Sequence, residues 1–360
     1  MRLLLAAGGT GGHVFPALAL AAEANRRGHR TRLLGAEAGM EARLAAEAGV
    51  EFRGVPAGKW DRQRPDPRQA LRAIRGLRAA LAEVRSFAPD VVVGFGGFAA
   101  LPGCVAAVFT RTPLLLHEGN ATPGRVTRWF AGRAASVALA MPEAADRLAH
   151  ARSTRVVGFP VREGRIEPLT ARARLGIPEH GTLTLVMGGS QGSQALNERL
   201  PEVYRRLPEA TRGHVLHATG PRWLETVQMA TSDLADYLTV GFVDATLAWS
   251  AADLAVVRSG VGTLSEAALH HVPVVTVPLP TSADDHQRSN AHAIAAAGAG
   301  FAVEQEDVPG LQQAWSTLLD PDRRATASEA MALRTPEGAA GRLLAEALRV
   351  AGEAGNEDES

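Results

Sequence analysis

The sequence predicts an α/β protein made of two doubly wound, parallel-sheet domains that face each other across a cleft. Short, continuously apolar runs alternate with alanine-rich helical stretches along the 360 residues. Such runs are typical of parallel strands that are covered on both faces. The pattern also restarts, because "LLLAAGGTGGH" at residues 3–13 is matched by "LTLVMGGSQGSQ" at residues 183–194. Each of these segments is a strand, a glycine loop and the start of a helix, so two similar domains are expected.

The apolar runs predict ten strands, and helical spacing predicts the helices between them. The expected strands are residues 2–6, 30–35, 91–95, 114–117, 136–140, 183–187, 215–218, 238–240, 254–257 and 274–277. Expected helices include residues 16–27, 66–84, 195–207, 263–271 and 284–297.

The domain boundary is expected where Gly and Pro cluster between patterned segments, at "RVVGFPVREGRIEP". The first domain then spans residues 1–157 and the second spans residues 158–335. A C-terminal helix at about residues 337–351 is expected to pack back on the first domain.

Composition and charge exclude several classes of protein. The chain has 38 Lys and Arg residues and 38 Asp and Glu residues, so its formal net charge is zero. No overall positive charge therefore favours nucleic acid as a partner. Cys104 is the single cysteine, which excludes an internal disulfide. The first apolar run ends after about six residues, too short for a signal peptide, and no stretch has transmembrane length. A soluble protein that is not secreted is expected.

The two matched glycine loops indicate anion sites. A glycine loop between a strand and a helix presents backbone N–H groups and the positive end of the helix dipole. Val14 stands where a dinucleotide fingerprint needs its third glycine, and no Gly-Lys-Ser/Thr of a P-loop occurs. A tight turn without a ligand is the alternative for each loop.

His13 distinguishes the first loop. The positive end of a helix disfavours the imidazolium, so a neutral imidazole able to accept a proton is expected. A histidine that only hydrogen-bonds the turn is the alternative. A further glycine stretch at residues 94–103 also follows a strand, and Glu118 and Asn120 follow the next one. These two side chains are expected either to contact a sugar hydroxyl or to cap a helix.

In the second half, "RSGVGTLSEAA" places Thr263 and Glu266 at capping-box spacing, although Glu266 could equally bind a ribose diol. In "PTSADDHQRSNA", one aspartate is expected to cap a helix and Gln287 to bind a hydroxyl. No metal is expected, because HExxH and CxxC are absent and the sequence Asp320-Pro321-Asp322 is typical of a turn between helices. No cofactor is expected either.

The predicted helix at residues 66–84 is amphipathic and basic. An anionic membrane surface could bind it, or its apolar side could simply pack on the sheet. The two interpretations are compatible if only one end is exposed. The residues expected to form a membrane patch are Trp60, Leu71, Arg72, Ile74, Arg75 and Arg78.

The ordered set of motifs resembles the MurG family, the UDP-N-acetylglucosamine transferases that add GlcNAc to undecaprenyl-pyrophosphoryl-MurNAc-pentapeptide in bacterial cell-wall synthesis. The resemblance covers essentially the whole chain. The motifs that carry it are "GGTGGHVFPALA", "GFGGFAALPG", "HEGN", "GGSQGSQALN", "RSGVGTLSEA" and "DDHQRSNA".

The resemblance implies a GT-B fold of two Rossmann-like domains, with UDP-GlcNAc held mainly by the second and the lipid acceptor (lipid I) by the first. It implies inverting transfer to the MurNAc 4-hydroxyl, which gives lipid II. It also implies a peripheral position on the cytoplasmic face of the plasma membrane, with no nucleic-acid partner and with other cell-wall or division proteins as conceivable partners.

The resemblance also assigns site residues. His13 matches the candidate base, and Glu118 matches a weaker candidate or an orienting group. Arg162 and Val243 match uracil contacts, Ser190 a diphosphate contact and Glu266 a ribose contact. The remaining donor- or substrate-binding positions are Thr10, Gly11, Gly12, Asn120, Thr263, Leu264, Ser265 and Gln287.

Two positions depart from the family pattern, which usually has Asn where Phe159 stands and Gln where Gly119 stands. Two other functions compete with transfer. One is a UDP-GlcNAc 2-epimerase, which would need no lipid and typically uses more catalytic carboxylates. The other is a catalytically silent protein that binds a sugar nucleotide.

Overall fold

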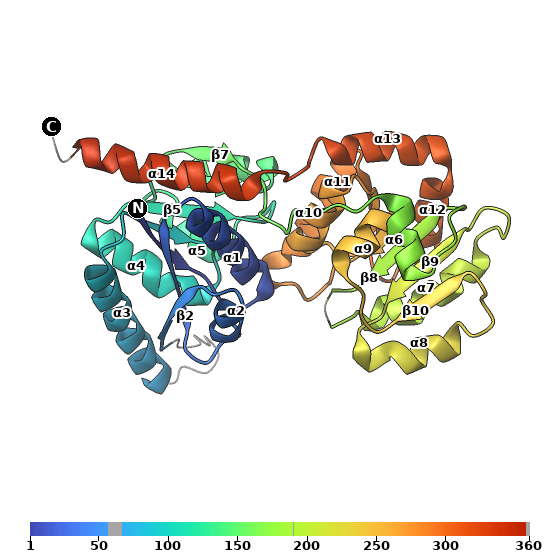
Figure 1. Cartoon of the computed structure of the whole chain (residues 1–360), viewed down its shortest axis with the longest axis horizontal. Helices are drawn as coiled ribbons and strands as arrows, with labels where there is room; N and C mark the ends of the chain where they lie inside the picture. The colour runs from blue at the N-terminus through green and yellow to red at the C-terminus, as the bar shows by residue number, and fades with distance from the viewer. Residues whose placement is uncertain (57–66, 190, 358–360) are drawn as a thin grey trace. The chain divides into compact units, whose positions relative to one another are not determined.

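The computed structural model describes residues 1–56, 67–189 and 191–357 of the chain. These residues form two compact α/β units (Figure 1). The first unit contains Met1–Val161 and Gly338–Ser360, and the second contains Arg162–Glu337. The boundary expected from the sequence lay between residues 157 and 158.

The first unit contains a parallel sheet of seven strands in the order β3-β2-β1-β4-β5-β6-β7. Its strands are β1 (Arg2–Ala6), β2 (Arg30–Ala36), β3 (Glu51–Val55), β4 (Val91–Gly94), β5 (Leu114–Glu118), β6 (Ser136–Leu139) and β7 (Thr154–Val156). Its helices are α1 (Gly11–Arg26), α2 (Glu41–Glu47), α3 (Pro67–Phe87), α4 (Leu101–Thr110), α5 (Arg125–Phe130) and α14 (Ala339–Glu357), with 3₁₀ turns η1 (Phe98–Ala100) and η2 (Pro142–Arg147).

The second unit contains a parallel sheet of six strands in the order β10-β9-β8-β11-β12-β13. Its strands are β8 (Leu183–Met187), β9 (His214–Ala218), β10 (Tyr237–Val240), β11 (Leu254–Val257), β12 (Val274–Thr276) and β13 (Gly300–Ala302). Its helices are α6 (Pro168–Leu175), α7 (Gln194–Arg206), α8 (Leu224–Ala230), α9 (Ala245–Ala251), α10 (Val261–Leu269), α11 (His286–Ala296), α12 (Val308–Leu319) and α13 (Pro321–Ala332), with 3₁₀ turns η3 (Pro221–Trp223) and η4 (Ala283–Asp285).

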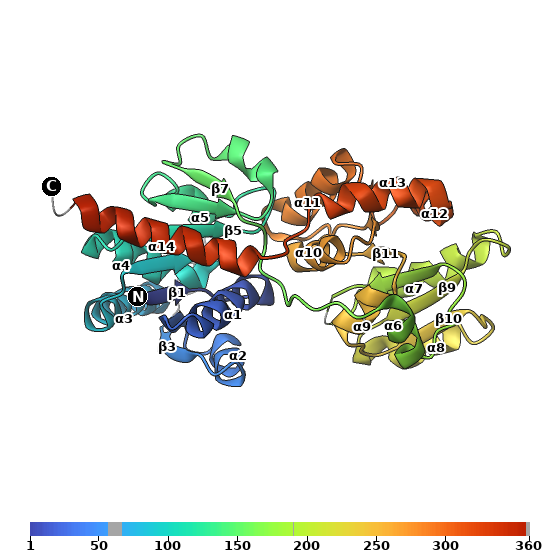
Figure 2. The same cartoon turned by 45° about the horizontal axis from the view of Figure 1, so that its top comes forward.

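The core explains why the strands are continuously apolar. Along β1, Leu4 packs on the face covered by α3, α4 and α5, whereas Leu3 and Leu5 pack on the face covered by α1 and α14. Successive side chains of a strand point to opposite faces, so a strand buried on both sides needs apolar residues throughout. Helix α14 lies beside α1 in both views (Figure 1, Figure 2), which completes the second layer of the first unit.

Each sheet has a topological switch point, where strand order reverses. It lies between β1 and β4 in the first unit and between β8 and β11 in the second. The paired strands end in register, with Ala6 opposite Gly94 and Met187 opposite Val257. Open α/β sheets bind ligands at the carboxyl ends of the strands at such points. All three glycine stretches singled out in the sequence leave strands at these positions.

The predicted elements differ from the structure in two instructive ways. Helix α1 begins at Gly11, five residues before the predicted start at Pro16, so His13 lies in its first turn. Strands β3, β7 and β13 were not predicted, and each lies at the edge of its sheet. An edge strand is covered less completely and needs no continuous apolar run; in β7 all three side chains are exposed. The expected α/β class, with one doubly wound parallel sheet in each of two units, is confirmed.

Candidate functional site

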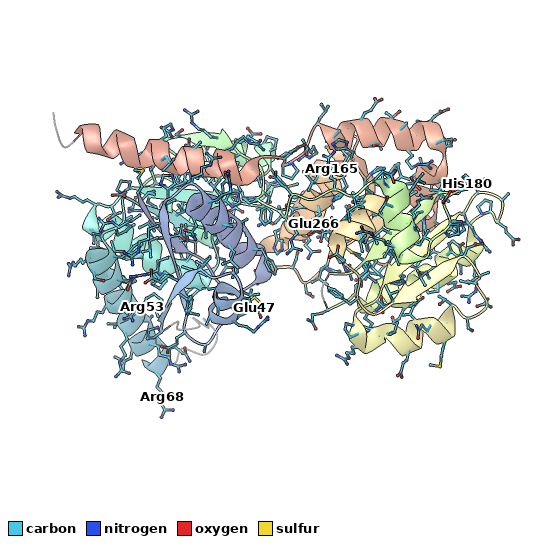
Figure 3. The ribbon with its side chains drawn as sticks, viewed as in Figure 1. Glu47, Arg53, Arg68, Arg165, His180 and Glu266 are labelled. Carbon is cyan, nitrogen blue, oxygen red and sulfur yellow. The ribbon has the colours of Figure 1, made fainter. Side chains whose placement is uncertain are left out.

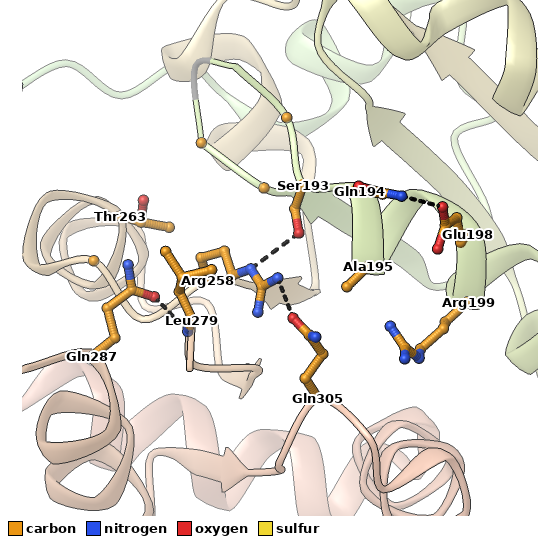
Figure 4. A pocket seen from close by; sticks show the side chains of 14 residues that line it. Ser193, Gln194, Ala195, Glu198, Arg199, Arg258, Thr263, Leu279, Gln287 and Gln305 are labelled. Carbon is orange, nitrogen blue, oxygen red and sulfur yellow. Dashed lines mark hydrogen bonds between the residues drawn. The ribbon is translucent and has the colours of Figure 1, made fainter. Parts of the chain in front are cut away.

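The second unit contains a pocket of about 600 Å³ at its switch point. The loop after β8 and the start of α7 form one wall, and the residues after β11, β12 and β13 and the start of α11 form the others (Figure 4). Of the residues expected from the sequence, Thr263 and Gln287 line this pocket. Ser190 lies outside the described residues, but its neighbours Gly188, Gly189 and Gly192 line the pocket too.

A buried arginine lies under this glycine loop. Arg258 is 8% exposed, and its Nε donates to Ser193 Oγ at 3.0 Å. Its Nη1 donates to the carbonyls of Val277 and Pro278, each at 3.0 Å, and its Nη2 donates to Gln305 Oε1 at 2.7 Å (Figure 4). All of these acceptors are neutral.

Among the described residues, no carboxylate forms an ion pair with Arg258. Burial lowers the pKa of Arg258 and the nearby Arg199 lowers it further, while the more distant carboxylate of Glu306, which forms no ion pair with it, offsets part of this shift. A buried cation without an anionic partner is unfavourable unless an anion arrives to neutralise it. The pocket is therefore suited to a negatively charged group, and the motif analysis had not singled out Arg258.

A buried hydrogen-bond chain supports the same loop from behind. His217 Nε2 donates to Asn197 Oδ1 at 3.0 Å, and its Nδ1 accepts from the Tyr237 hydroxyl at 2.9 Å. Asn197 Nδ2 in turn donates to the carbonyl of Thr219 at 3.0 Å. A Cβ at Gly192 would lie 1.8 Å from that carbonyl oxygen. Only glycine allows this approach, and burial lowers the pKa of His217 to about 3, which keeps it neutral.

The capping-box interpretation of Thr263 and Glu266 is wrong. Helix α10 begins at Val261 and its N-cap, Gly260, has no side chain. Thr263 is thus already inside the first turn. Glu266 instead accepts a hydrogen bond from Trp249 Nε1 at 3.0 Å through Oε2. Burial raises the pKa of Glu266, and the Trp249 hydrogen bond partly offsets this. Leu264 is buried, Ser265 is half-buried, and neither lines the pocket.

The helix start at α11 also differs from the expectation that an aspartate caps it. Asp285 stands at the N-cap position with φ 55°, but its side chain makes no cap hydrogen bond and pairs with Arg288 at 3.0 Å. Gln287 Oε1 accepts from the backbone N–H of Leu279 at 3.0 Å. This contact fixes the side chain and turns its amide nitrogen, a hydrogen-bond donor, toward the pocket (Figure 4).

Arg162 and Val243 lie outside the pocket lining. Arg162 is exposed at the start of the second unit, and Val243 is half-buried after β10. The segment after Arg162 runs along the start of α9, since a Cβ at Gly164 would lie 3.6 Å from Thr246 Cγ2. The backbone N–H of Ile166 donates to Ser250 Oγ at 3.0 Å. The two segments that were expected to contact the uracil ring, one at Arg162 and one at Val243, are therefore neighbours in the second unit.

In the first unit, His13 lies between the loops that follow β1 and β4. Its Nδ1 is 3.1 Å from Thr10 Oγ1, and its backbone N–H donates to the carbonyl of Thr10 at 3.1 Å. A Cβ at Gly97 would lie 2.9 Å from Nδ1, so the bare backbone of Gly97 makes room for the ring. Gly11 and Gly12 are the first residues of α1, whose first N–H groups have no intrahelical acceptor.

Behind this loop lies a second histidine, His117, buried between two aromatic rings. The ring centroids of Phe95 and Phe159 are 5.5 and 5.7 Å from that of His117, and His117 Nε2 donates to the carbonyl of Gly158 at 3.2 Å. Burial lowers the pKa of His117 to about 4, and the neighbouring His13 contributes to the shift. Phe159, one of the two departures from the family pattern, is thus an apolar packing partner.

Glu118 is buried and organises the loop before α5. Its Oε1 accepts from the backbone N–H and the side-chain amide of Asn120 at 3.0 and 3.3 Å. Its Oε2 accepts from the backbone N–H of Gly124 at 2.9 Å and from Thr127 Oγ1 at 2.6 Å. A carboxylate engaged in four hydrogen bonds is suited to holding Asn120 in place, which favours the orienting role over that of a base.

Helix α3 is buried at its C-terminal end and exposed at the other. Val84 lies in the core, whereas Leu71 and Ile74 are 49% and 51% exposed. Arg72, Arg75 and Arg78 are exposed beside them, and Arg68 projects outward near the start of the helix (Figure 3). One end of this helix therefore packs on the core, and the other end leaves apolar and basic side chains exposed. Trp60 lies outside the described residues.

In the described part of the chain, no helix is both long and apolar enough to cross a membrane. No group of three or more His, Cys, Asp and Glu side chains among these residues could hold a metal ion. Asp320 caps α13, its Oδ1 accepting from the backbone N–H groups of Asp322 and Arg323 at 3.1 and 3.0 Å, as expected for a turn between helices.

Comparison with known proteins finds relatives along the whole chain. Residues 3–139 match the glycosyltransferase family 28 N-terminal domain, and residues 183–342 match the family's C-terminal domain. The chain is 43% identical to the UDP-N-acetylglucosamine–N-acetylmuramyl-(pentapeptide) pyrophosphoryl-undecaprenol N-acetylglucosamine transferase of Deinococcus deserti, over 95% of this chain and 96% of the relative. It is 44% identical to the protein of the same name from Thermus thermophilus, over 95% and 97%. The crystal structure of Acinetobacter baumannii MurG matches with a TM-score of 0.81 at 28% identity, over 97% and 99%.

Proposed function

The chain belongs to glycosyltransferase family 28, in the group of the MurG transferases, and on that basis we propose that it transfers GlcNAc from UDP-GlcNAc to lipid I. The product is lipid II, in which a β(1→4) bond joins GlcNAc to MurNAc. The observation that carries the proposal is the pocket at the second switch point, where a glycine loop and the buried Arg258 form a site suited to an anion.

The donor occupies the second unit. The diphosphate lies over the loop at residues 188–193, where the backbone N–H groups, Ser190 and the charge of Arg258 stabilise it. The Glu266 carboxylate binds the ribose diol, while Arg162 and Val243 contact the uracil. Gln287 donates its amide N–H to a hydroxyl of GlcNAc. Support comes from the orientation of Gln287 and from the absence of a capping role for Glu266.

The acceptor occupies the first unit. Its own diphosphate is bound at the start of α1, where Thr10, Gly11 and Gly12 present hydrogen-bond donors. Asn120, held by Glu118, contacts a sugar. When His13 Nδ1–H donates to Thr10 Oγ1, the Nε2 of the same ring carries the lone pair that accepts a proton.

The chemistry follows from these positions. His13 Nε2 takes the proton of the MurNAc 4-hydroxyl as its oxygen attacks the anomeric carbon of GlcNAc from the face opposite UDP. A new C–O bond forms, the bond to the UDP oxygen breaks, and the anomeric configuration inverts. The negative charge that develops on the leaving diphosphate is stabilised by Arg258 and the loop amides. The proton leaves the imidazole to solvent after turnover.

The exposed end of α3 attaches the first unit to the anionic cytoplasmic face of the plasma membrane, where lipid I is held. Apolar side chains enter the interface and the arginines pair with lipid headgroups. The exposed Phe109 on α4 and Trp129 on α5 belong to helices on the same face of the sheet as α3. These two exposed aromatic side chains are further candidates for contact with the membrane.

One assay separates the candidate functions. The purified chain is incubated with UDP-[¹⁴C]GlcNAc and a lipid I analogue that has a shortened lipid chain. Radioactivity transferred to the analogue in a β(1→4) linkage is the expected result. Release of ManNAc without an acceptor would instead identify a 2-epimerase, and donor binding without any turnover would identify a silent sugar-nucleotide-binding protein.

A further inference from the structure

The first glycine loop is built around a carboxylate that takes no part in the chemistry above. Glu41, the first residue of α2, is completely buried. Its Oε1 accepts a hydrogen bond from the backbone N–H of Gly9 at 2.8 Å. Its Oε2 has no hydrogen-bond partner, and no cation forms an ion pair with the carboxylate among the residues that the structure describes.

Two glycines leave room for this side chain. A Cβ at Gly8 would lie 1.8 Å from Glu41 Oε1, and a Cβ at Gly39 would lie 1.7 Å from Oε2. Real Cβ atoms do not approach other heavy atoms this closely, so both positions exclude any larger residue while Glu41 keeps its place. The backbone on both sides of the carboxylate is therefore shaped around it.

Such a carboxylate is unfavourable as a purely structural element. Burying a charge that has one hydrogen bond and no ion pair costs free energy that an apolar side chain would not. The position of Glu41 at the start of a helix offsets only part of this cost. Stability alone therefore does not explain the arrangement, which points to a role for Glu41 in holding Gly9 in place.

The contacts lead from Glu41 to the candidate base. Gly8, beside Oε1, turns its carbonyl toward Gly97, where an added Cβ would lie 2.6 Å from that oxygen. The same Cβ would lie 2.9 Å from His13 Nδ1. Glu41, Gly8, Gly97 and the imidazole of His13 thus form one continuous packed row within the first unit.

We propose that Glu41 is a positioning residue for the acceptor half of the reaction. It fixes the loop at Gly8 and Gly9 and thereby sets the position of His13. Because the N–H of Gly9 donates to Glu41, it is not available to an anion. An anion at this loop is therefore left with the N–H groups of Gly11 and Gly12. This inference rests on the proposed transfer to lipid I.

The kinetic test uses Glu41→Ala, Glu41→Gln and, should the alanine variant not fold, Glu41→Asp, whose shorter side chain no longer reaches Gly9. We expect Glu41→Ala to lower kcat about 10- to 100-fold, because small displacements of a catalytic group cost this much. The affinity for UDP-GlcNAc should not change, because the donor binds the second unit. Glu41→Gln should retain most of the wild-type kcat, since its amide oxygen still accepts from Gly9.

The matched control is Glu346→Ala. Glu346 is a buried carboxylate of the same unit, 5% exposed, that pairs with Arg349 at 2.6 Å on α14. Its removal should lower thermal stability and leave kcat unchanged. An equal loss of kcat in Glu346→Ala would show that the effect of Glu41→Ala is one of general stability, which would overturn the inference.

A double-mutant cycle tests the packing directly. Gly39 has no positive φ, so Gly39→Ala should lower kcat only by displacing Glu41. The double variant should then be no worse than Glu41→Ala alone. Additive losses would overturn the inference, as would wild-type kcat in both single variants.

Hydrogen–deuterium exchange provides a measure that does not depend on turnover. Exchange in a peptide covering residues 7–14 should accelerate in Glu41→Ala and in Gly39→Ala but not in Glu346→Ala. Wild-type exchange in the first two would overturn the inference whatever the activity. If the wild-type chain transfers no GlcNAc, the proposed function fails, and the exchange data still decide whether Glu41 fixes the loop.

Discussion

Arg258 supplies the donor pocket with a positive charge that cannot move away. Its four hydrogen bonds go to neutral oxygens of Ser193, Val277, Pro278 and Gln305. The guanidinium is thereby held in one orientation under the glycine loop by partners that carry no charge. A fixed charge of this kind stabilises a leaving diphosphate without the reorganisation that a flexible side chain would need.

Replacing Arg258 by Met should therefore lower kcat by about 100-fold, since one preorganised electrostatic donor is worth about this much. Stability should fall by about 1–3 kcal/mol because buried acceptors lose their donor. Arg258→Lys should keep the positive charge, so its kcat and its stability should fall less than those of Arg258→Met. Steady-state kinetics and thermal unfolding measure both effects, and Arg205→Met, at an exposed arginine paired with Asp233, is the control. Unchanged turnover in Arg258→Met would remove the residue from the mechanism.

The His13→Ala variant should bind UDP-GlcNAc with wild-type affinity and lose most of its turnover, by about 100-fold or more, as expected for removal of a general base. Donor affinity is measured by calorimetry and turnover by transfer to the lipid I analogue. His13→Ala with wild-type kcat would exclude the imidazole as the base.

The sequence identified several site residues by pattern but not the contacts that decide their roles. His13, Thr263 and Gln287 follow glycine loops or helix starts, which leave a local signal. Arg258 opens the motif "RSGVGTLSEAA" and Glu41 belongs to no motif, but the motif alone does not give the role of Arg258, because the importance of both residues comes from burial beside loops distant in the chain. The capping-box prediction for Thr263 and Glu266 was wrong because the spacing of the two residues does not show where the helix begins. The helix begins two residues before Thr263.

At the scale of elements, the continuously apolar strands were predicted well, whereas three of the four edge strands were not. Strands β1, β8 and β11 match their predicted limits because burial on both faces requires an uninterrupted apolar run. Edge strands β3, β7 and β13 carry mixed sequences. Helix α1 was predicted to begin at Pro16, where the helical spacing of apolar residues was taken to start. Its actual start at Gly11 places two glycines and His13 in that turn.

Helix α3 carries the prediction that belongs to this scale. Changing Arg72, Arg75 and Arg78 to Glu should weaken binding to vesicles of anionic lipid by about 100-fold or more, because each arginine near the surface contributes about 1 kcal/mol. Vesicle co-sedimentation measures this. The control reverses three exposed arginines of the second unit, Arg174, Arg206 and Arg323. Equal binding of the wild-type and α3 variants would assign α3 to core packing alone.

At the scale of the whole molecule, each unit buries a neutral histidine, so stability depends on pH. Burial lowers the pKa of His117 from 6.5 to about 4 and that of His217 from 6.5 to about 3. Below pH 6.5 the unfolded chain takes up protons that the folded chain does not. The stabilisation from each group is thus complete above that pH and is lost progressively as the pH falls toward the folded value.

Between pH 7 and pH 5, each of these histidines should reduce the free energy of unfolding of its unit by about 2 kcal/mol. Urea denaturation at pH 7, 6 and 5 measures the change. His117→Gln and His217→Gln should each flatten the pH dependence for one unit. A free energy of unfolding that stays constant over this range would show that neither histidine is held neutral by the fold.

The proposed mechanism requires the nucleotide to bind at the second switch point. A crystal structure of the chain with UDP-GlcNAc tests this directly. The diphosphate should lie in the pocket over the loop at residues 188–193, close to Arg258, with the ribose at Glu266. A nucleotide bound at the first unit, or with its diphosphate outside that pocket, would contradict the proposed mechanism.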